Sequence, residues 1–425
     1  MEQQSKLRKH LQELPTVDNH PSDLLSWDPS KTRQLLSGMG VALMDKEVDD
    51  TENTPHDMFF GCLSPPPKRQ KCRDRKSENA FVIARRPRQN RRLEPGVLWE
   101  SIPDELLLGI FFFLPLTDLL KASLVCKRWH RLVYDESLWH SIDLADKTLN
   151  PGAISHVLSA GVVAIRCPRS FIGETMFKDS RPLRLQHADL SNCQMTISAL
   201  EDIFSRCRKL VNLSLEGMVL SDDIIRCIGH NSGLRRLNLC GCSGFTAEAL
   251  EVMITSCTRL EELNLSWCDF TPDHIQVAAN NISESLTQLN LSGYRQNLLQ
   301  SDVQTIIKRC RKLINIDFSD SVMLTSDCLA LFHELDNLQH LSLSRCYHIP
   351  STALTELGNI STLKTLNVFG IVPCNQMLLL RESMPRIKIN SYQFTSIGRP
   401  TTGSKKNKAI WGIQCRLTFN NSLTS

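Results

Sequence analysis

The amino-acid sequence predicts an α/β solenoid, in which strand–helix units stack so that their strands form one parallel sheet. Three observations support this class. A motif of spaced leucines recurs along the chain, helical apolar patterns fill the intervals between its copies, and cysteines keep step with the leucines. The composition agrees, because 41% hydrophobic and 22% charged residues are ordinary values for a chain that buries a core.

The repeated motif, L-x-x-L-x-L, is the strongest signal in the chain. Its copies follow one another at spacings of 21 to 27 residues, the period of leucine-rich repeats. The strong copies begin at Leu210, Leu234, Leu260, Leu286, Leu313, Leu338 and Leu363, and weaker ones begin at Trp139, Val162, Leu185 and Met384. We therefore expect leucine-rich repeats over residues 141–390, with the parallel sheet on a concave face and helices on the convex face.

Cysteines recur at two fixed places in these repeats. Four lie eight residues after a first leucine, and three lie three residues before one: Cys193, Cys242, Cys268 and Cys346, then Cys207, Cys257 and Cys310. This periodicity predicts small apolar core residues. The chain contains no C-x-x-C pair, no H-E-x-x-H and no G-x-x-x-x-G-K-[ST], so we expect no catalytic residue, no metal site and no cofactor.

Two columns of residues are expected to face the concave side between the leucines. The position four after each strong first leucine is small and polar: Ser214, Asn238, Asn264, Asn290, Asp317, Ser342 and Asn367. The seventh position is glycine in four copies and Trp267, Asp320 or Arg345 in the others, and Arg295 and Tyr347 follow two residues after this column. These five side chains make either ordinary surface contacts, including an Asp320–Arg345 ion pair worth about 0–1 kcal/mol, or a recognition patch. The periodicity leaves both interpretations open.

A short apolar segment, 101–139, precedes the repeats. Pro103, Asp104 and Glu105 open a predicted helix that runs to Pro115, and Thr117 or Asp118 is expected to cap a second helix. Some forty residues with this much apolar surface cannot hide it all within themselves. The segment is either a cap on the repeat array or a surface for a partner.

The residue blocks of this segment resemble an F-box. They are Pro103-Asp104-Glu105-Leu106-Leu107, Ile110-Phe111, Asp118-Leu119-Leu120, Val125-Cys126-Lys127-Arg128-Trp129 and Leu138-Trp139. An F-box followed by leucine-rich repeats is the architecture of substrate receptors in SCF-type cullin–RING ubiquitin ligases. The resemblance implies a small all-α domain over 96–140 that docks a Skp adaptor subunit, and through it the cullin–RING core. The implied docking residues are Pro103, Leu106, Leu107, Ile110, Leu119, Leu120, Val125, Cys126 and Trp129.

The resemblance also implies a second binding face. In one kind of receptor in this family, the late repeats and the returning tail bind a small Cks-type subunit of cyclin-dependent kinases (CDKs), and together they select phosphothreonine-bearing CDK inhibitors. The implied residues are Arg295, Asp320, Arg345, Tyr347 and Phe394, to which the seventh column adds Trp267. The strong repeats show no cluster of arginines in that column, so we expect the Cks subunit to hold the phosphate.

The tail, 391–425, begins with a polar linker. After it, Trp411, Ile413, Cys415, Leu417 and Phe419 alternate with other residues as in a strand. The tail is expected to cap the last repeat, where the sheet has an open edge, or to cross the concave face; both can hold, with different parts of the tail serving each.

The region before the F-box, 1–95, is expected to be disordered, and its charge is uneven. Residues 1–63 carry eleven acids and six bases, whereas 68–92 carry eleven bases and two acids. Lys68, Arg69 and Lys71 fit a nuclear-import signal, and Ser64 and Thr54 are candidate phosphosites because proline follows each. The resemblance implies that residues 30–40 dock a cyclin–CDK complex. Nucleic-acid binding is not expected, because no aromatics are interleaved with the basic residues.

Membrane and secretory classes are not expected either. The N-terminus lacks the apolar core of a signal peptide, and the longest apolar run, LLLGIFFFLPL, is too short to span a bilayer. We expect a protein of the nucleus and cytoplasm. Two other functions stay open: a leucine-rich-repeat scaffold not linked to ubiquitin, whose F-box-like segment is only a cap, and, more remotely, a catalytic ligase, for which the sequence lacks the zinc-ligand pattern of a RING.

Overall fold

The structure is a computed structural model that describes residues 99–401 and 409–418. These residues belong to one compact unit, Lys71–Ser425. The predicted disordered region and cyclin-docking segment lie outside the described residues, as do the import residues Lys68, Arg69 and Lys71 and the phosphosites Ser64 and Thr54. Within the described part of the chain, no helix has the length and apolar character that a membrane crossing requires.

The F-box-like segment forms a short 3-10 turn and three α-helices. They are η2 (Trp99–Ser101), α3 (Asp104–Phe112), α4 (Leu116–Ala122) and α5 (Lys127–Val133). Pro103 starts α3 and Pro115 starts α4, since proline is compatible with a helix start. The prediction of one second helix capped by Thr117 or Asp118 is wrong: it begins at Leu116 and breaks after Ala122. Cys126 is extended there, and its Sγ accepts the Trp129 N–H, which caps α5.

The repeats form one parallel sheet whose strand order is β13-β12-β11-β10-β9-β8-β7-β6-β5-β3-β1-β16. In chain order, the first seven strands of this sheet are β1 (Ser141–Asp143), β3 (Ala164–Arg166), β5 (His187–Asp189), β6 (Asn212–Ser214), β7 (Arg236–Asn238), β8 (Glu262–Asn264) and β9 (Gln288–Asn290). They are followed by β10 (Asn315–Asp317), β11 (His340–Ser342), β12 (Thr365–Asn367), β13 (Lys388–Ile389) and β16 (Leu417–Thr418). The predicted solenoid is therefore confirmed, including its weaker early copies.

One predicted register is wrong at the end of the array. Alignment on Met384 places Ile387 opposite Leu366, but the structure pairs Ile389 with Leu366. Met384, Ile387 and Ile389 are all buried, so each of these apolar positions contributes to the core. The spacing of apolar residues alone cannot say which of them lies on the paired strand.

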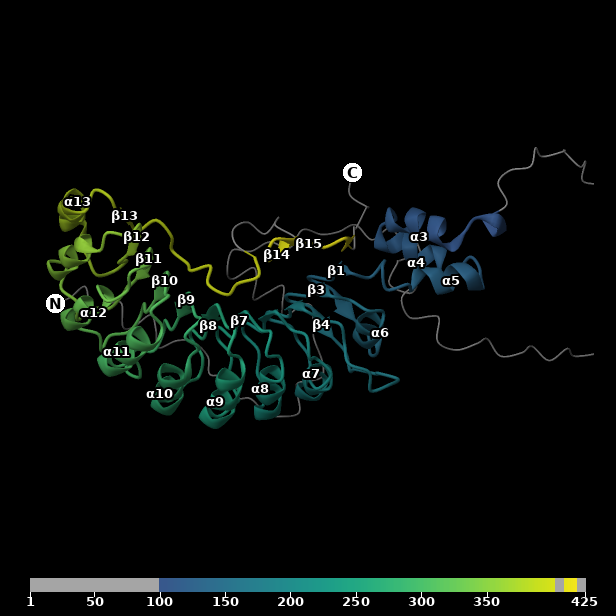
Figure 1. Ribbon diagram of the computed structural model, residues 1–425, viewed down its shortest axis with the longest axis horizontal. Coiled ribbons are helices and arrows are strands. Elements are labelled where there is room, and N and C mark those ends of the chain that lie inside the picture. Colours follow the sequence, from purple (N-terminus) through teal and green to yellow (C-terminus); the bar gives the residue numbers. More distant parts are fainter. Residues whose placement is uncertain (1–98, 402–408, 419–425) are drawn as a thin grey trace, which may run out of the picture. The chain divides into compact units, whose positions relative to one another are not determined.

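Helices lie along one side of the sheet (Figure 1). They are α6 (Ala153–Ser159), α7 (Ile197–Phe204), α8 (Asp222–Gly229), α9 (Ala247–Ser256), α10 (Pro272–Asn281), α11 (Gln300–Arg309), α12 (Leu329–Phe332) and α13 (Cys374–Ser383), with 3-10 turns η3 (Ser326–Cys328) and η4 (Ala353–Asn359). Thr196, Ser221 and Thr246 cap α7, α8 and α9 with their hydroxyls. A separate two-strand ladder, β2 (Thr148–Leu149) with β4 (Phe171–Ile172), lies at the early repeats.

The core lies between sheet and helices and contains the repeated leucines. Leu213, Leu237, Leu263 and Leu289 are fully buried in successive strands. The predicted core position of the seven periodic cysteines is confirmed, since all are buried. Burial raises the pKa of the Cys193 thiol to about 12, so it stays protonated at neutral pH and is a poor nucleophile.

The small polar column is structural. Asn238, Asn264, Asn290 and Asp317 are buried, and a side-chain oxygen of each accepts the backbone N–H two residues on, at 3.0–3.1 Å. This bond closes the turn that follows each strand and satisfies an otherwise unpaired donor. The column therefore builds the ends of these four strands, and variation for recognition is left to the positions beyond it.

The tail crosses the concave side, and its end joins the first repeat (Figure 1). It forms a hairpin of β14 (Ala409–Ile410) and β15 (Ile413–Gln414), and then β16, which pairs in parallel with β1. The expectation of one strand over 411–419 is wrong, because Trp411 and Gly412 have positive φ and turn the chain; Phe419 lies outside the described residues. In the described residues no tail strand pairs with β13, which stays at one edge of the sheet, whereas β16 extends the opposite edge.

Candidate docking surfaces

The seventh column has one backbone conformation throughout the array. In the ten copies from Trp139 to Leu363 its residues all have a positive φ: Asp146, Arg169, Asn192, Gly217, Gly241, Trp267, Gly293, Asp320, Arg345 and Gly370. Glycine adopts this conformation without cost, whereas most other residues lose about 1 kcal/mol or more. The positive φ therefore explains why glycine occupies this column in four strong copies. Trp267, Asp320 and Arg345 adopt the same φ although it is unfavourable for residues with a side chain.

The glycines also leave room for the side chain of the preceding repeat. A Cβ on Gly293 would lie 2.6 Å from the ring of Trp267, and one on Gly370 would lie 3.1 Å from Cγ of Arg345. Asn192 lies over Gly217 in the same way. Asn192, Trp267 and Arg345 thus lie across the next repeat, whose own seventh residue is glycine.

Asp320 and Arg345 form a two-pronged ion pair between neighbouring repeats. Arg345 Nε donates to Asp320 Oδ1 at 2.6 Å, and Nη2 donates to Oδ2. The hydrogen bond to Asp320 raises the pKa of Arg345. Asp320 is 5% exposed while the side chain of Arg345 is 47% exposed. The pair therefore presents a fixed guanidinium whose remaining N–H groups are available to an acceptor.

Exposed aromatic side chains accompany this pair. Tyr347 is 61% exposed two residues after Arg345, Trp267 is half exposed, and Phe394 of the tail is 79% exposed. Arg295 is also exposed, and within the described residues no carboxylate pairs with it. All six sequence-predicted residues of the second face are thus placed, and five have accessible side chains. We call Asp320, Arg345 and Tyr347 the late triplet.

The tail is held against the middle of the concave face. Asn264 Nδ2 donates to the Ile397 carbonyl at 3.1 Å, and the Gly398 N–H donates to Glu262 Oε2 at 3.1 Å. Gly398 has φ +67°, and a Cβ there would lie 3.0 Å from the Leu237 carbonyl. Only glycine fits this close approach of two backbones.

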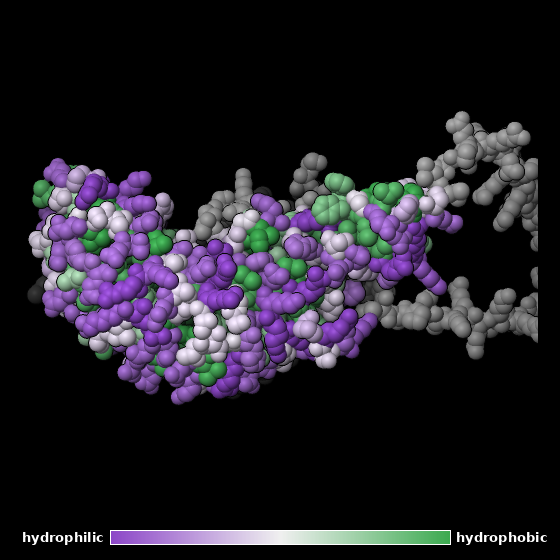
Figure 2. Space-filling view, in the orientation of Figure 1, coloured by the Kyte–Doolittle hydropathy of each residue, from purple (hydrophilic) through white to green (hydrophobic). Residues whose placement is uncertain are grey.

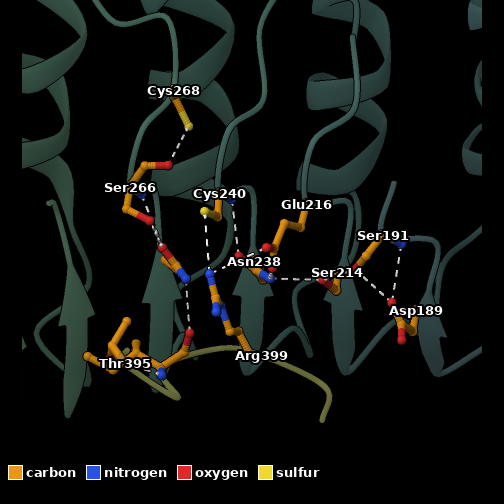
Figure 3. A network of polar contacts seen from close by, with 12 residues as sticks. Asp189, Ser191, Ser214, Glu216, Asn238, Cys240, Ser266, Cys268, Thr395 and Arg399 are labelled. Carbon is orange, nitrogen blue, oxygen red and sulfur yellow. Dashed lines mark hydrogen bonds and ion pairs between the residues drawn. The ribbon is translucent and has the colours of Figure 1, made fainter. Parts of the chain in front are cut away.

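Arg399 continues this contact into a buried polar network (Figure 3). Its Nη2 lies 3.3 Å from Glu216 Oε1, and Glu216 Oε2 accepts a hydrogen bond from Asn238. Asn238 also donates to Ser214, which bonds Ser191 and through it Asp189. Burial raises the pKa of Asp189. The chain's own tail thus supplies hydrogen-bond and ion-pair partners to Glu262 and Glu216 on the concave face.

The first docking surface lies on the F-box-like helices. Leu106, Ile110 and Phe113 of α3 and its end are exposed, as are Leu124 and Val125 between α4 and α5. Figure 2 shows apolar side chains gathered over this region. Exposed apolar clusters of this kind mark sites of protein association.

The sequence-predicted adaptor residues divide into two groups. Leu106, Ile110, Val125, Cys126 and Pro103 are exposed, whereas Leu107 and Leu119 are fully buried and Leu120 and Trp129 are half-buried. Leu107 and Leu119 therefore support the surface from beneath and leave no area of their own for a partner. The same surface includes residues that the sequence analysis omitted: Phe112, Phe113 and Leu124.

Arg416 is the most important residue that sequence reasoning missed. Its guanidinium donates to the carbonyls of Phe111, Phe112 and Leu138, and its Cζ lies 4.3 Å from the Phe112 ring centroid. Its backbone N–H donates to Ser141 Oγ at 2.9 Å. Arg416 therefore caps the C-terminal carbonyls of α3 and ties that helix to the first repeat. A lone arginine in a tail carries no sequence signal for this role.

The described residues bring together no three histidine, cysteine, aspartate or glutamate side chains that could hold a metal ion. The geometry on both faces is that of contact surfaces for other macromolecules: an apolar patch on helices, and a rim of fixed charges and aromatic rings.

Comparison with family models matches two parts of the chain. A model described as F-box-like matches residues 99–145, and a model described as SKP2 LRR domain matches residues 152–418. The second match covers more than half of the chain and includes the hairpin and β16 of the tail.

Among curated proteins, the chain is similar to several, including two that are named F-box/LRR-repeat proteins. Coronatine-insensitive protein homolog 1b of Oryza sativa subsp. japonica is 25% identical over 308 residues, which cover 69% of this chain and 48% of the relative. F-box/LRR-repeat protein 21 of Mus musculus is 22% identical over 73% of this chain and 79% of the relative. F-box/LRR-repeat protein 12 of Homo sapiens is 33% identical over 33% of this chain and 40% of the relative. The match spans about half the length of the rice protein.

Proposed function

The chain belongs to the SKP2 LRR domain family, and on that premise we propose that it is the substrate-recognition subunit of an SCF E3 ubiquitin ligase. In this role it has no catalytic residue of its own: the F-box-like helices bind a Skp adaptor, and through it the cullin–RING core, while the repeats bind the protein to be ubiquitinated. No enzymatic family is indicated by the models that match the chain.

The observation that carries this proposal is the exposed apolar surface of α3 and the α4–α5 connection. Arg416 and β16 already join the F-box-like helices to the first repeat, so a plain cap would need no further contact. Leu106, Ile110 and Val125 nevertheless remain exposed. This favours an adaptor over the alternative of a scaffold not linked to ubiquitin.

Adaptor binding is tested with a matched pair of variants. Leu106→Asp places a charge in the apolar patch and is expected to weaken adaptor binding at least tenfold. Leu378→Asp alters an equally exposed leucine on α13, outside the patch, and is expected to bind as the parent does. Isothermal titration with purified Skp adaptor measures both. Equal affinity of the parent and Leu106→Asp would overturn the F-box assignment.

We further propose a likeness to S-phase kinase-associated protein 2 as a whole. Blocks such as LNLSWC, QLNLSGYR, HLSLSRCY and IWGIQCRLT resemble that protein. The proposal assigns the chain to the G1/S transition of the cell cycle, with a Cks-type subunit on the late triplet, Trp267, Arg295 and Phe394. Phosphothreonine-bearing CDK inhibitors are then the substrates.

The charge pattern supports the Cks subunit as the holder of the phosphate. A phosphate needs several clustered donors, yet the guanidinium of Arg345 is already paired with Asp320. A titration with a phosphothreonine inhibitor peptide, with and without the Cks subunit, tests this. Capture only when Cks is present is expected. Capture by the chain and adaptor alone would show that this face binds phosphate itself, and unchanged Cks affinity in Arg345→Glu would remove the late triplet from the interface.

The N-terminal region carries three further proposals. Lys68, Arg69 and Lys71 direct nuclear import, Ser64 and Thr54 accept phosphate, and residues 30–40 dock a cyclin–CDK complex. Alanine at the three basic residues of a fluorescently tagged chain is expected to shift it from nucleus and cytoplasm to cytoplasm alone. An unchanged distribution would remove the import signal.

A further inference from the structure

Three residues on the rim of the early repeats have the same arrangement as the late triplet. Asp146 and Arg169 occupy the seventh column of neighbouring repeats, as Asp320 and Arg345 do, and Phe171 follows Arg169 by two residues, as Tyr347 follows Arg345. Arg169 Nε donates to Asp146 Oδ1 at 2.7 Å, and its Nη2 donates to Oδ2 at 2.9 Å. We call Asp146, Arg169 and Phe171 the early triplet. Nothing in the function proposed above uses it.

Stability does not explain the early triplet. Asp146 and Arg169 have φ of 58° and 56°, a conformation that costs each about 1 kcal/mol or more. Their ion pair is exposed on both sides, 59% and 54%, and such a pair returns only about 0–1 kcal/mol. Glycine, which occupies this column at four other repeats, would avoid the strain. Strained residues held in place without a gain in stability indicate a binding role.

The pair arranges a donor for an outside molecule. Two parallel hydrogen bonds to Asp146 fix the plane of the guanidinium, so Nη1 and one N–H of Nη2 are directed away from the aspartate. The hydrogen bond from Arg169 lowers the pKa of Asp146, which keeps the pair intact in mildly acidic solution. A carboxylate or a backbone carbonyl is the acceptor that such a donor fits.

Apolar side chains lie along the rim beside this donor. Phe171 is 52% exposed, and Val219, in the equivalent place two repeats on, is 58% exposed. Gln194 lies between them and forms a backbone bridge with Phe171. At about 4.8 Å per strand, Phe171 and Val219 are about 10 Å apart, which three residues of extended peptide span.

We propose that the early triplet binds a second segment of the same substrate, an extended stretch with an acidic side chain for Arg169 and an apolar side chain for Phe171. The inference rests on the proposed function, because it requires a substrate held at the late repeats. The sheet order places β1 and β3 between those repeats and the F-box-like helices. A substrate chain that leaves the late triplet toward the adaptor therefore passes this rim.

The strand count gives the length that the substrate needs. Seven strand steps separate β11 from β3 in the sheet, or about 34 Å, which about ten residues of extended chain cover. A short phosphopeptide held at the late repeats cannot reach the early triplet, whereas a whole substrate protein can. The two probes therefore separate the early site from the late one.

The test uses the full chain with its Skp adaptor and Cks subunits. The probes are a ten-residue phosphothreonine peptide centred on the modified threonine of a CDK inhibitor, and the full-length phosphorylated inhibitor. Arg169→Gly restores the glycine that the backbone prefers, and Phe171→Ser removes the ring. Each variant is expected to weaken binding of the full-length inhibitor about tenfold and to leave the short peptide unchanged.

Two controls complete the design. Arg226→Ala removes an exposed, aspartate-paired arginine of α8 and is expected to change neither affinity. Exchange of the pair, Asp146→Arg with Arg169→Asp, keeps the ion pair but turns a carboxylate outward. This double variant is expected to lose as much affinity for the full-length inhibitor as Arg169→Gly does. Unchanged binding of the full-length inhibitor by Arg169→Gly and Phe171→Ser overturns the inference, as does an equal loss for both probes. If the unaltered complex binds neither probe, the proposed function itself falls.

Discussion

The two halves of the concave face differ in what covers them. From β1 to β8 the chain's own tail supplies contacts: β16 pairs with β1, Arg399 meets Glu216, and the Ile397 carbonyl accepts from Asn264. From β9 to β11, within the described residues, no hydrogen bond from the tail is found; the Tyr392 N–H meets Asn367 of β12 at 3.4 Å, and Arg345 and Tyr347 are exposed. The same repeat is thus used in two ways. Where the tail contacts the strands, the middle of the face is internal structure; the late repeats and the rim that carries the early triplet stay accessible to another molecule.

The largest expected effect comes from breaking the tail's anchor in the early half. Arg416→Ala removes charge-assisted hydrogen bonds to the carbonyls of Phe111, Phe112 and Leu138, and is expected to lower the free energy of unfolding by about 3 kcal/mol. Urea denaturation measures the loss, and hydrogen exchange in α3 shows where it acts. Arg416→Lys keeps the charge but not the fork, and is expected to lie between parent and alanine variant. Parent-like stability of Arg416→Ala would mean that β16 alone holds the joint.

A smaller loss of stability is expected when a glycine of the seventh column is replaced by alanine, and the loss should differ between the two halves. A methyl group on Gly293 would clash with the Trp267 ring at 2.6 Å, whereas one on Gly241 has nothing nearer than 3.8 Å. Both glycines have positive φ, so alanine costs each about 1–2 kcal/mol through the backbone. Gly293→Ala is expected to cost more than Gly241→Ala and also to shift the tryptophan fluorescence. Identical spectra for the two variants would mean that Trp267 does not lie over Gly293 in solution.

The alanine variants of two asparagines in the polar column are expected to differ by about 1 kcal/mol in their free energy of unfolding. Asn264 and Asn290 both accept from the backbone N–H two residues on, but only Asn264 also donates to the tail, at Ile397. Asn264→Ala therefore leaves an extra buried carbonyl unpaired, and should be less stable than Asn290→Ala by about 1 kcal/mol. Paired urea titrations check this. If Asn290→Ala were as costly, the tail would contribute nothing measurable here.

The smallest expected effect is a pH dependence that differs between the halves. Burial is the main cause that lowers the pKa of His187 in β5 and of His340 in β11 below 6.5. Because the folded pKa is the lower one, the stability that each neutral ring contributes is present above the unfolded value of 6.5 and is lost as the pH falls from there through the folded pKa. His187 Nδ1 also accepts from Asn212 Nδ2, a bond that a protonated ring cannot keep, whereas His340 bonds a hydroxyl of Thr365 that can turn.

Replacement of each histidine by glutamine separates the halves. His187→Gln is expected to reduce the loss of stability between about pH 7.5 and 5.5 by more than His340→Gln does. Urea denaturation at the two pH values gives both differences. A larger effect of His340→Gln would contradict the greater acid sensitivity of the early half.

Sequence periodicity was sufficient for the repeats and for the buried cysteines, because each leucine predicts its neighbours at a fixed spacing. Periodicity was insufficient for positions where the backbone conformation decides which residue is present. Four glycines in one column invite a functional account, yet positive φ explains them, and it leaves Asp146, Arg169 and Asn192 as members of the same column in the weaker copies. The positive φ of a residue such as Arg169 is invisible in the sequence.

The tail was the hardest part to predict, for a different reason. Arg399 and Arg416 act through partners 183 and more than 270 residues away, and neither lies in a repeated pattern. Apolar alternation from Trp411 onward indicated a strand but not its partner. The choice between the two edges of the sheet depends on the carbonyls at the end of α3, which only the folded F-box-like helices bring to the first repeat.

The hydrogen bond between Arg416 and Ser141 joins residues 275 positions apart, so it can form only late in the synthesis of the chain. A ribosome adds roughly 5–20 residues per second and releases the N-terminal part first. The F-box-like helices and β1 therefore wait for tens of seconds before the residues that fasten them exist, while the repeats between can stack one upon another as they emerge. A newly made chain has its binding faces before it has the joint that fixes them in relation to each other. Emergence of the tail is thus the step at which the F-box-like helices and the first repeat are fastened to each other.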